Sequence, residues 1–375
     1  MVKQFATQPT KRSTSAWPLT LAYIALVIYA SLYPFENWRN QGVEPWAFLF
    51  QPWPKYWTKF DVIINVMGYA PLGFLGALTA LRTGRGKHAI WLVTLLILLL
   101  SFCLESTQNY LLARVASNVD LALNVLGGLL GALCAWMLEK AGAIDHWSHF
   151  KHTWFVPNAS GALVLLALWP LALVFPAAVP LGLGQVLERL ETALGSALTG
   201  TPFLEWLPMR TVELQPLVPG AEMLCVMLGA LVPVLLGFSV IRLKTKRLAF
   251  VGLVLFSAVA VSALSATLSY GPDHAMAWLT RPVQLGLLLS AGLSLLLVLL
   301  PRRVCVAVLL LALVLQLSIL NLAPANPYFA QTLQTWEQGR FIRFHGVVQW
   351  LGWLWPFVTV IYLMQRISQR RSDDN

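Results

Sequence analysis

The chain has 375 residues, of which 58% are hydrophobic and only 11% are charged, and its formal net charge is +10. Soluble globular domains contain about one charged residue in four, so this composition excludes a water-soluble globule. A charge of this size would suit a nucleic-acid partner, but the basic residues lie between long apolar segments, which is typical of membrane topology.

Ten apolar segments of 16 to 21 residues follow one another along the chain, and this is the length that crosses a hydrocarbon core of about 30 Å. The sequence therefore predicts an all-α, polytopic integral membrane protein with about ten transmembrane helices. The predicted spans are Trp17–Tyr33, Val62–Leu81, Ala89–Leu104, Val119–Leu138, Ala159–Val179, Met223–Ile241, Leu248–Leu268, Val283–Leu300, Val304–Leu322 and Val347–Met364.

Most of the 26 lysines and arginines lie in alternate connecting segments. Both terminal segments belong to this set, with Lys3, Lys11 and Arg12 at one end and Arg366 and Arg370 at the other. Under the positive-inside rule both termini are cytoplasmic. Helical spans further indicate a multi-pass protein of the plasma (inner) membrane, and no nucleic-acid partner is expected.

A basic segment interrupts the apolar pattern after the fourth predicted span. We therefore expect a four-span domain over residues 1–139, a basic cytoplasmic linker over 140–158 and a six-span domain over 159–375. Between the fifth and sixth spans, apolar residues recur at helical spacing from Leu183 to Leu198, with Glu188, Arg189 and Glu191 between them. This pattern predicts a helix that lies in the plane of the membrane interface.

Polar side chains gather at the outer ends of the second, third and fourth spans. Asp61 and Asn65, and likewise Asp120 and Asn124, are four residues apart and share a helix face. Because intramembrane ionisable residues are costly, this pattern predicts a functional cluster in the outer leaflet. The candidate ligand-binding residues are Asp61, Asn65, Glu105, Gln108, Arg114, Asp120 and Asn124.

Three acids and one arginine leave a negative surplus in this cluster. We expect Arg114 to pair with Asp120 or Glu105. The surplus then indicates a carboxyl with a raised pKa, a bound cation, or a ligand with hydroxyl and amine donors. In the structural alternative, Asp120 caps the fourth span and the asparagines only hold the helices together.

Other patterns add little chemistry. Gly127 and Gly131 have the G-x-x-x-G spacing that brings helices close together. His149 and His152 lie three residues apart, but an interfacial helix is favoured over a metal site there. The four cysteines lie singly in four spans. No nucleophile, cofactor or metal motif is assigned, and catalytic residues stay unknown.

The residues of the polar cluster also carry a family resemblance. Asp61-x-x-x-Asn65, Glu105-x-x-Gln108, Arg114 and Asp120-x-x-x-Asn124, together with the motif Pro71-Leu72-Gly73-Phe74 and the glycines Gly127 and Gly128, resemble the VanZ-like family over the first four spans. That family is named after a protein associated with resistance to the glycopeptide antibiotic teicoplanin. The resemblance implies a role in the cell envelope and a connection with glycopeptide antibiotic resistance, but no particular reaction.

Three functions stay open at this point. In the first, the cluster engages a lipid-linked or glycan-related ligand, such as an envelope precursor, alongside membrane lipids. In the second, the protein is an integral membrane transferase acting on lipid-linked sugars, with two of the carboxylates as acid and base. In the third, the last six spans form a transporter or scaffold. The oligomeric state is not indicated by the sequence.

Overall fold

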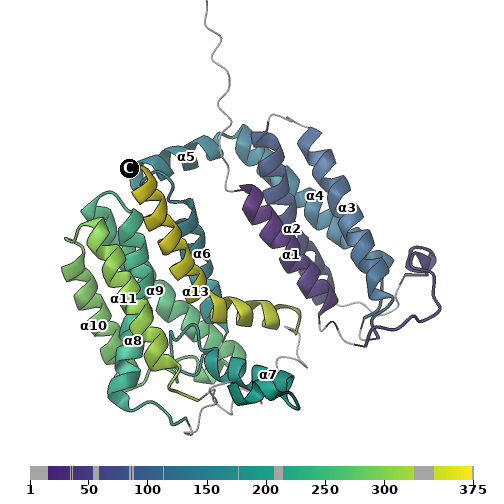
Figure 1. Cartoon of the computed structure of the whole chain (residues 1–375). Coiled ribbons are helices and arrows are strands. Elements are labelled where there is room, and N and C mark those ends of the chain that lie inside the picture. Colours follow the sequence, from purple (N-terminus) through teal and green to yellow (C-terminus); the bar gives the residue numbers. More distant parts are fainter. Residues whose placement is uncertain are drawn as a thin grey trace, which may run out of the picture. The chain divides into compact units, whose positions relative to one another are not determined.

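The computed structural model in Figure 1 describes residues 16–324 and 342–373, apart from positions 34, 36, 54–58, 84, 85, 87, 113, 176 and 207–213. These residues form helices with connecting loops, and no strand is present among them, only two isolated β-bridges. The predicted all-α class is therefore confirmed. The amino-terminal Lys3, Lys11 and Arg12 lie outside the described residues.

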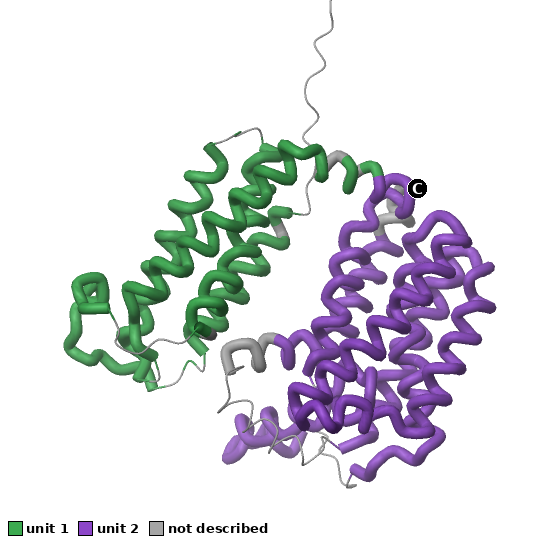
Figure 2. Tube along the Cα trace, turned by 180° about the vertical axis from the view of Figure 1, so that it is seen from behind, with its two compact units in different colours: residues 1–149 green, residues 150–375 purple. Residues whose placement is uncertain are grey.

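The chain divides into two compact units, Met1–His149 and Phe150–Asn375, which Figure 2 shows in green and purple. Helix α5 (Ala143–Trp154) contains this division and occupies most of the predicted basic linker. His149 and His152 lie in α5, so the expected helix is present there, while its interfacial position stays a prediction. The boundaries predicted at 139 and 159 stay a prediction.

The described residues of the first unit contain four longer helices before α5. In chain order they are α1 (Ala16–Leu32), α2 (Lys59–Arg82), α3 (His88–Gln108) and α4 (Asn118–Lys140), with a short 3-10 turn, η1 (Ala47–Phe50), in the first loop. Helix α2 packs chiefly against α4, and α3 packs against both of them.

Glycines set the close approach of α2 to α4. A Cβ atom on Gly131 would overlap the carbonyl oxygen of Ala70, and one on Gly127 would overlap that of Val66. In α2, a Cβ on Gly73 would overlap the backbone of Gly128. The G-x-x-x-G spacing of α4 therefore serves helix packing, as predicted.

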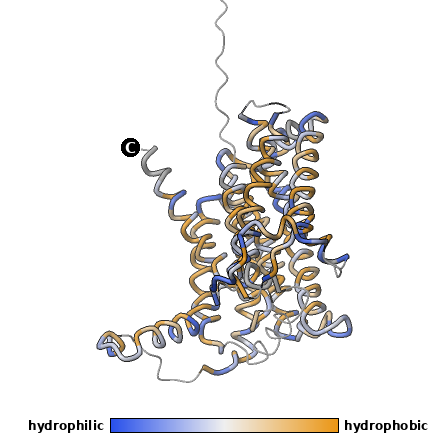
Figure 3. Tube along the Cα trace, turned by 90° about the vertical axis from the view of Figure 1, so that its right-hand side faces the viewer, coloured by the Kyte–Doolittle hydropathy of each residue, from blue (hydrophilic) through white to orange (hydrophobic). Residues whose placement is uncertain are grey.

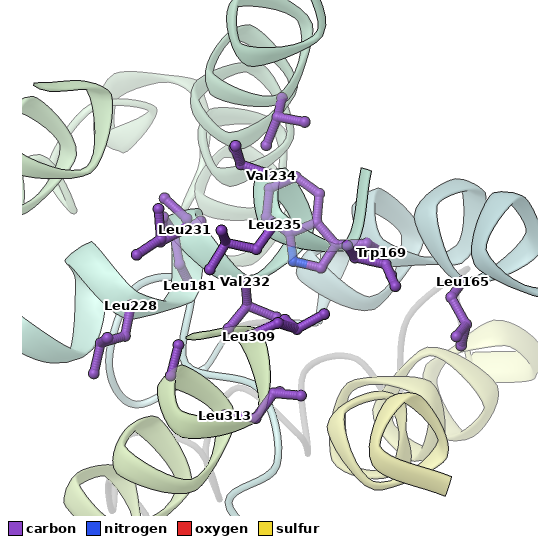
Figure 4. Packing of buried hydrophobic residues seen from close by; sticks show 14 of the residues in the cluster. Leu165, Trp169, Leu181, Leu228, Leu231, Val232, Val234, Leu235, Leu309 and Leu313 are labelled. Atoms are coloured by element: carbon purple, nitrogen blue, oxygen red, sulfur yellow. The ribbon is translucent and has the colours of Figure 1, made fainter. Parts of the chain in front are cut away.

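The second unit is built around α8 (Pro219–Val240), in which every residue from Leu228 to Val240 is buried. Around it pack α6 (Ser160–Val174), α9 (Lys244–Tyr270), α10 (Arg281–Leu297) and α11 (Arg302–Leu320), while α13 (Ile342–Asp373) packs against α6 and α11. Figure 4 shows the apolar side chains at this centre, among them Trp169 of α6, Leu235 of α8 and Leu309 of α11. The shorter elements are α7 (Leu187–Leu198), η2 (Pro202–Trp206) and η3 (Pro272–His274).

Six helices of the described part of the chain are long and apolar enough to cross a membrane: α2 from Asp61, α3, α4, α8, α9 and α11. Helices α6 and α10 are apolar but shorter, as is the Leu19–Leu32 part of α1. Figure 3 shows hydrophobic residues along most of the helices and hydrophilic ones at several of their ends. The chain is therefore a multi-pass membrane protein, while the count of ten spans stays a prediction.

The fifth predicted span, Ala159–Val179, is wrong in its second part. Helix α6 ends at Val174, and Phe175 is extended, with φ −72° and ψ 126°. Phe175 precedes a proline in the sequence, and the residue before a proline avoids the helical conformation. The next proline, Pro180, follows too soon for another helix to begin.

Residues 177–186 form an irregular segment whose centre is buried. Leu181 and Leu183 are only 2% and 4% exposed. The predicted interfacial helix therefore starts at Leu187 and does not include Leu183. Buried irregular backbone needs hydrogen-bond partners from the protein, and two side chains from the end of α11 and the residue after it supply them. Gln316 donates to the carbonyl oxygen of Leu181, and Asn321 donates to that of Gly184.

Candidate functional site

A hydrogen bond joins the two predicted i,i+4 pairs on α2 and α4. The Nδ2 atom of Asn65 donates to Oδ1 of Asp120 over 2.7 Å. Asn65 is buried and Asp120 is half-buried. Asp61 lies one turn before Asn65 and is also half-buried. The sequence thus predicted correctly that these two helix faces meet.

Helix α3 joins the same cluster through two further hydrogen bonds. Nδ2 of Asn124 donates to the hydroxyl oxygen of Ser101 over 3.0 Å, and both residues are buried. The backbone N–H of Ser117 donates to Oε2 of Glu105 over 2.9 Å, and Glu105 is only 3% exposed. Polar groups therefore connect all three helices at one level of the first unit.

Two members of the cluster, Tyr69 of α2 and Ser101 of α3, were not predicted from the sequence. Tyr69 is buried, its hydroxyl interacts with the side chains of Ser101 and Ser31, and Glu105 and Asp120 act on it electrostatically. Their spacing indicated that they share a helix face with the cluster, because Tyr69 follows Asn65 by four residues and Ser101 precedes Glu105 by four. Serine and tyrosine are common in apolar helices, so neither stood out.

Ser117 caps α4, not Asp120. The hydroxyl oxygen of Ser117 accepts hydrogen bonds from the backbone N–H groups of Val119 and Asp120. Asp120 lies within the first turn, where a carboxylate also benefits from the helix dipole. The alternative in which Asp120 is the cap is therefore wrong, and its side chain bonds to α2 instead.

Gln108 and Arg114 bind the carboxyl end of α1. Gln108 donates to the carbonyl oxygen of Ser31. Nη2 of Arg114 donates to the carbonyl oxygens of Tyr33 and Ala30 over 2.8 and 3.2 Å. A cation at this end of a helix stabilises its last carbonyl groups. The pairing of Arg114 with Asp120 or Glu105 stays a prediction.

One polar atom at the centre of the cluster has no hydrogen-bond partner among the residues that the structure describes. This atom is Oδ1 of Asn124, and the residue is only 4% exposed. Leaving a buried acceptor unsatisfied costs about 1–3 kcal/mol. The cluster therefore contains an acceptor that a hydroxyl or amine donor would satisfy, close to the carboxylates of α3 and α4.

The polar groups of the cluster suit hydrogen bonding to a ligand. Across the described ranges, no three His, Cys, Asp or Glu side chains are grouped so that they could hold a metal ion. The polar groups are instead amides, hydroxyls and carboxylates distributed over α2, α3 and α4. Such a set can accept hydrogen bonds from a ligand rich in hydroxyl or amine groups.

Comparison with known proteins places the first part of the chain in a family. Residues 3–139, which include the whole polar cluster, match the VanZ/LLP1 family. No curated protein and no solved structure matches the chain. The resemblance seen in the motifs is confirmed for this region: residues 3–139 are a VanZ-like membrane region.

Proposed function

We propose that the polar cluster of the first unit binds the headgroup of a lipid-linked or glycan-related ligand of the cell envelope. The buried, unpartnered Oδ1 of Asn124 carries this proposal, because it offers an acceptor beside Asp120 and Glu105. A sugar or similar headgroup presents several hydroxyl donors, and these complement a surplus of acceptors.

The half-buried residues of the cluster lie where a headgroup would enter it. Asp61 and Asp120 lie in the first turns of α2 and α4 and keep part of their surface exposed. A headgroup that reaches these carboxylates first would then extend toward the buried amide of Asn124. The lipid portion would stay among the apolar faces of the unit. A link to glycopeptide antibiotic resistance, which the family resemblance implies, belongs to the same proposal.

Native mass spectrometry of the purified protein tests the binding proposal. We expect a hydroxylated or sugar-bearing lipid to co-purify with the wild type. Its content should fall about tenfold in Asp120→Asn, because hydrogen bonds to a charged group contribute about 1.5–3 kcal/mol. Asn124→Leu, which removes the amide acceptor, should show a similar fall.

The matched control is Glu139→Gln, which also turns an acid into an amide but lies exposed at the opposite end of α4. It should retain the ligand as the wild type does. Equal ligand content in all four proteins, each with an unchanged melting temperature, would contradict the proposal. The cluster would then serve only to hold the helices together.

We also propose that both termini face the cytoplasm of a plasma (inner) membrane, which the distribution of basic residues supports. Reporter fusions after Asn375 check this orientation. A fluorescent protein should be fluorescent there, whereas alkaline phosphatase, which needs an oxidising compartment, should be inactive. Active phosphatase at the carboxyl terminus would contradict it.

A further inference from the structure

A pocket lies in the second unit, where the irregular segment after α6 meets α7 and α13. The pocket is partly open to the outside, and its empty space amounts to roughly 420 Å³ when the open solvent at its mouth is included. Most of its lining is apolar, from residues such as Ala172, Phe175 and Gly182. The charged residue in the lining is Arg189 of α7, and Trp353 of α13 lies against it.

Arg189 is held in the pocket by an aromatic ring. The carbon at the centre of its guanidinium lies 4.7 Å from the centroid of the Trp353 ring, which is a cation–π contact. Among the described residues no group accepts a hydrogen bond from the guanidinium, so its planar edge can donate to a ligand. Glu188 acts on it electrostatically from the neighbouring position of the helix.

The backbone around Arg189 is fixed by hydrogen bonds. The N–H of Gly184 donates to the carbonyl oxygen of Gly352 over 2.9 Å and so joins the irregular segment to α13. Oδ1 of Asn321 accepts from the N–H groups of Val186 and Leu187 at the start of α7. The pocket is therefore formed before any ligand enters, which lowers the entropic cost of binding.

The exposed apolar face of α7 indicates that this pocket lies at a membrane interface. Leu187, Leu190 and Leu194 are 43%, 51% and 39% exposed on this short amphipathic helix. A helix with such an apolar stripe and charged residues beside it lies in the interface plane. On α13, Trp350 stacks edge-on against Trp353 with ring centroids 5.3 Å apart. Paired tryptophans are typical of the headgroup layer.

We propose that Arg189 and Trp353 form a binding site for the phosphate group of an anionic membrane lipid. Guanidinium groups bind phosphate in a two-point manner through their planar fork. The apolar wall around Phe175 would receive the glycerol and the first methylene groups. The site lies wholly in the second unit, so its failure and that of the polar cluster are distinguishable.

Protonation does not limit the site. Burial lowers the pKa of the Arg189 guanidinium, and the nearby Glu188 opposes this shift. An arginine nevertheless remains protonated at any pH where proteins are studied. The cation is thus partly desolvated but still charged, and this state strengthens its attraction to a phosphate.

Native mass spectrometry with added short-chain phosphatidylglycerol tests the proposal on the full-length protein in neutral detergent. We expect Arg189→Gln to weaken binding about tenfold, since it removes a charge-assisted pair. The lipid affinity of Arg189→Lys should lie between those of the wild type and Arg189→Gln, because lysine keeps the charge but lacks the planar fork of the guanidinium. Arg281→Gln is the matched control, as it removes an exposed arginine of the same unit.

The competing probes identify the source of the phosphate. If inorganic phosphate displaces the lipid only at millimolar concentration, the site is one for a lipid headgroup. If it competes equally well, the phosphate chemistry stands and the ligand is a soluble phosphate compound. Unchanged lipid binding in Arg189→Gln, or an equal loss in Arg281→Gln, would overturn the proposal. Melting temperatures without lipid show whether each variant is folded.

Discussion

Replacing Gly131 by alanine is expected to lower the free energy of unfolding by about 1–3 kcal/mol. The added methyl group would overlap the carbonyl oxygen of Ala70 and come within 2.9 Å of the backbone nitrogen of Phe74. Both obstacles are backbone atoms of α2, so they cannot rotate away as a side chain would. The two helices must therefore move apart.

Alanine is otherwise favoured over glycine in a helix by about 1 kcal/mol. The predicted loss is thus the opposite of what intrinsic helix propensity gives. Gly68→Ala is the matched control, because a Cβ at that position in α2 would meet no atom within 4 Å. Thermal unfolding in detergent, followed by tryptophan fluorescence, compares the two variants. If Gly131→Ala were as stable as Gly68→Ala, α2 and α4 would not be in contact as described.

Moving α2 and α4 apart would also disturb the polar cluster. Asn65 and Asp120 bond across the α2–α4 interface, so a wider interface would lengthen this hydrogen bond. Ligand binding should therefore fall in Gly131→Ala even where the protein is still folded at low temperature. The glycines of α4 thus set the distance between α2 and α4, and the polar side chains of α4 form their hydrogen bonds across that distance.

The periodicity of the sequence predicted a large part of this cluster. Spacings of four residues place Asp61 with Asn65 and Asp120 with Asn124, and helix geometry alone then fixes their faces. That the two faces meet depends on the glycines, which were also visible. The target of Gln108 was not visible, since a main-chain carbonyl at the end of α1 has no sequence signature.

The irregular segment after α6 shows a second limit. Its composition is as apolar as that of a span, so hydropathy alone predicts a helix through Val179. Two prolines four residues apart indicated instead that the helix ends before Val179. The side chains that satisfy its backbone, Gln316 and Asn321, lie at the end of α11 and directly after it, more than 130 positions further along the chain. Pairings over such separations follow from tertiary packing and not from local pattern.

Arg247 provides the other large expected effect, and the sequence placed it only among the cytoplasmic basic residues. In the structure it is 3% exposed, in the first turn of α9. Nη1 donates to the carbonyl oxygens of Val298 and Leu300 after α10, and Nη2 donates to that of Phe238 near the end of α8. One guanidinium thus holds three helix ends together.

Arg247→Leu is expected to cost about 3 kcal/mol or more, because it leaves three carbonyl groups without these donors in a buried place. Lys244→Gln is the control, since it removes an exposed charge one turn earlier and should leave the melting temperature nearly unchanged. Arg247→Lys should recover part of the loss, as an ammonium group cannot reach all three oxygens in the geometry of the fork. Equal melting temperatures for Arg247→Leu and Lys244→Gln would mean that Arg247 contributes only charge to the topology, and the end of α8 would then be held by apolar packing alone.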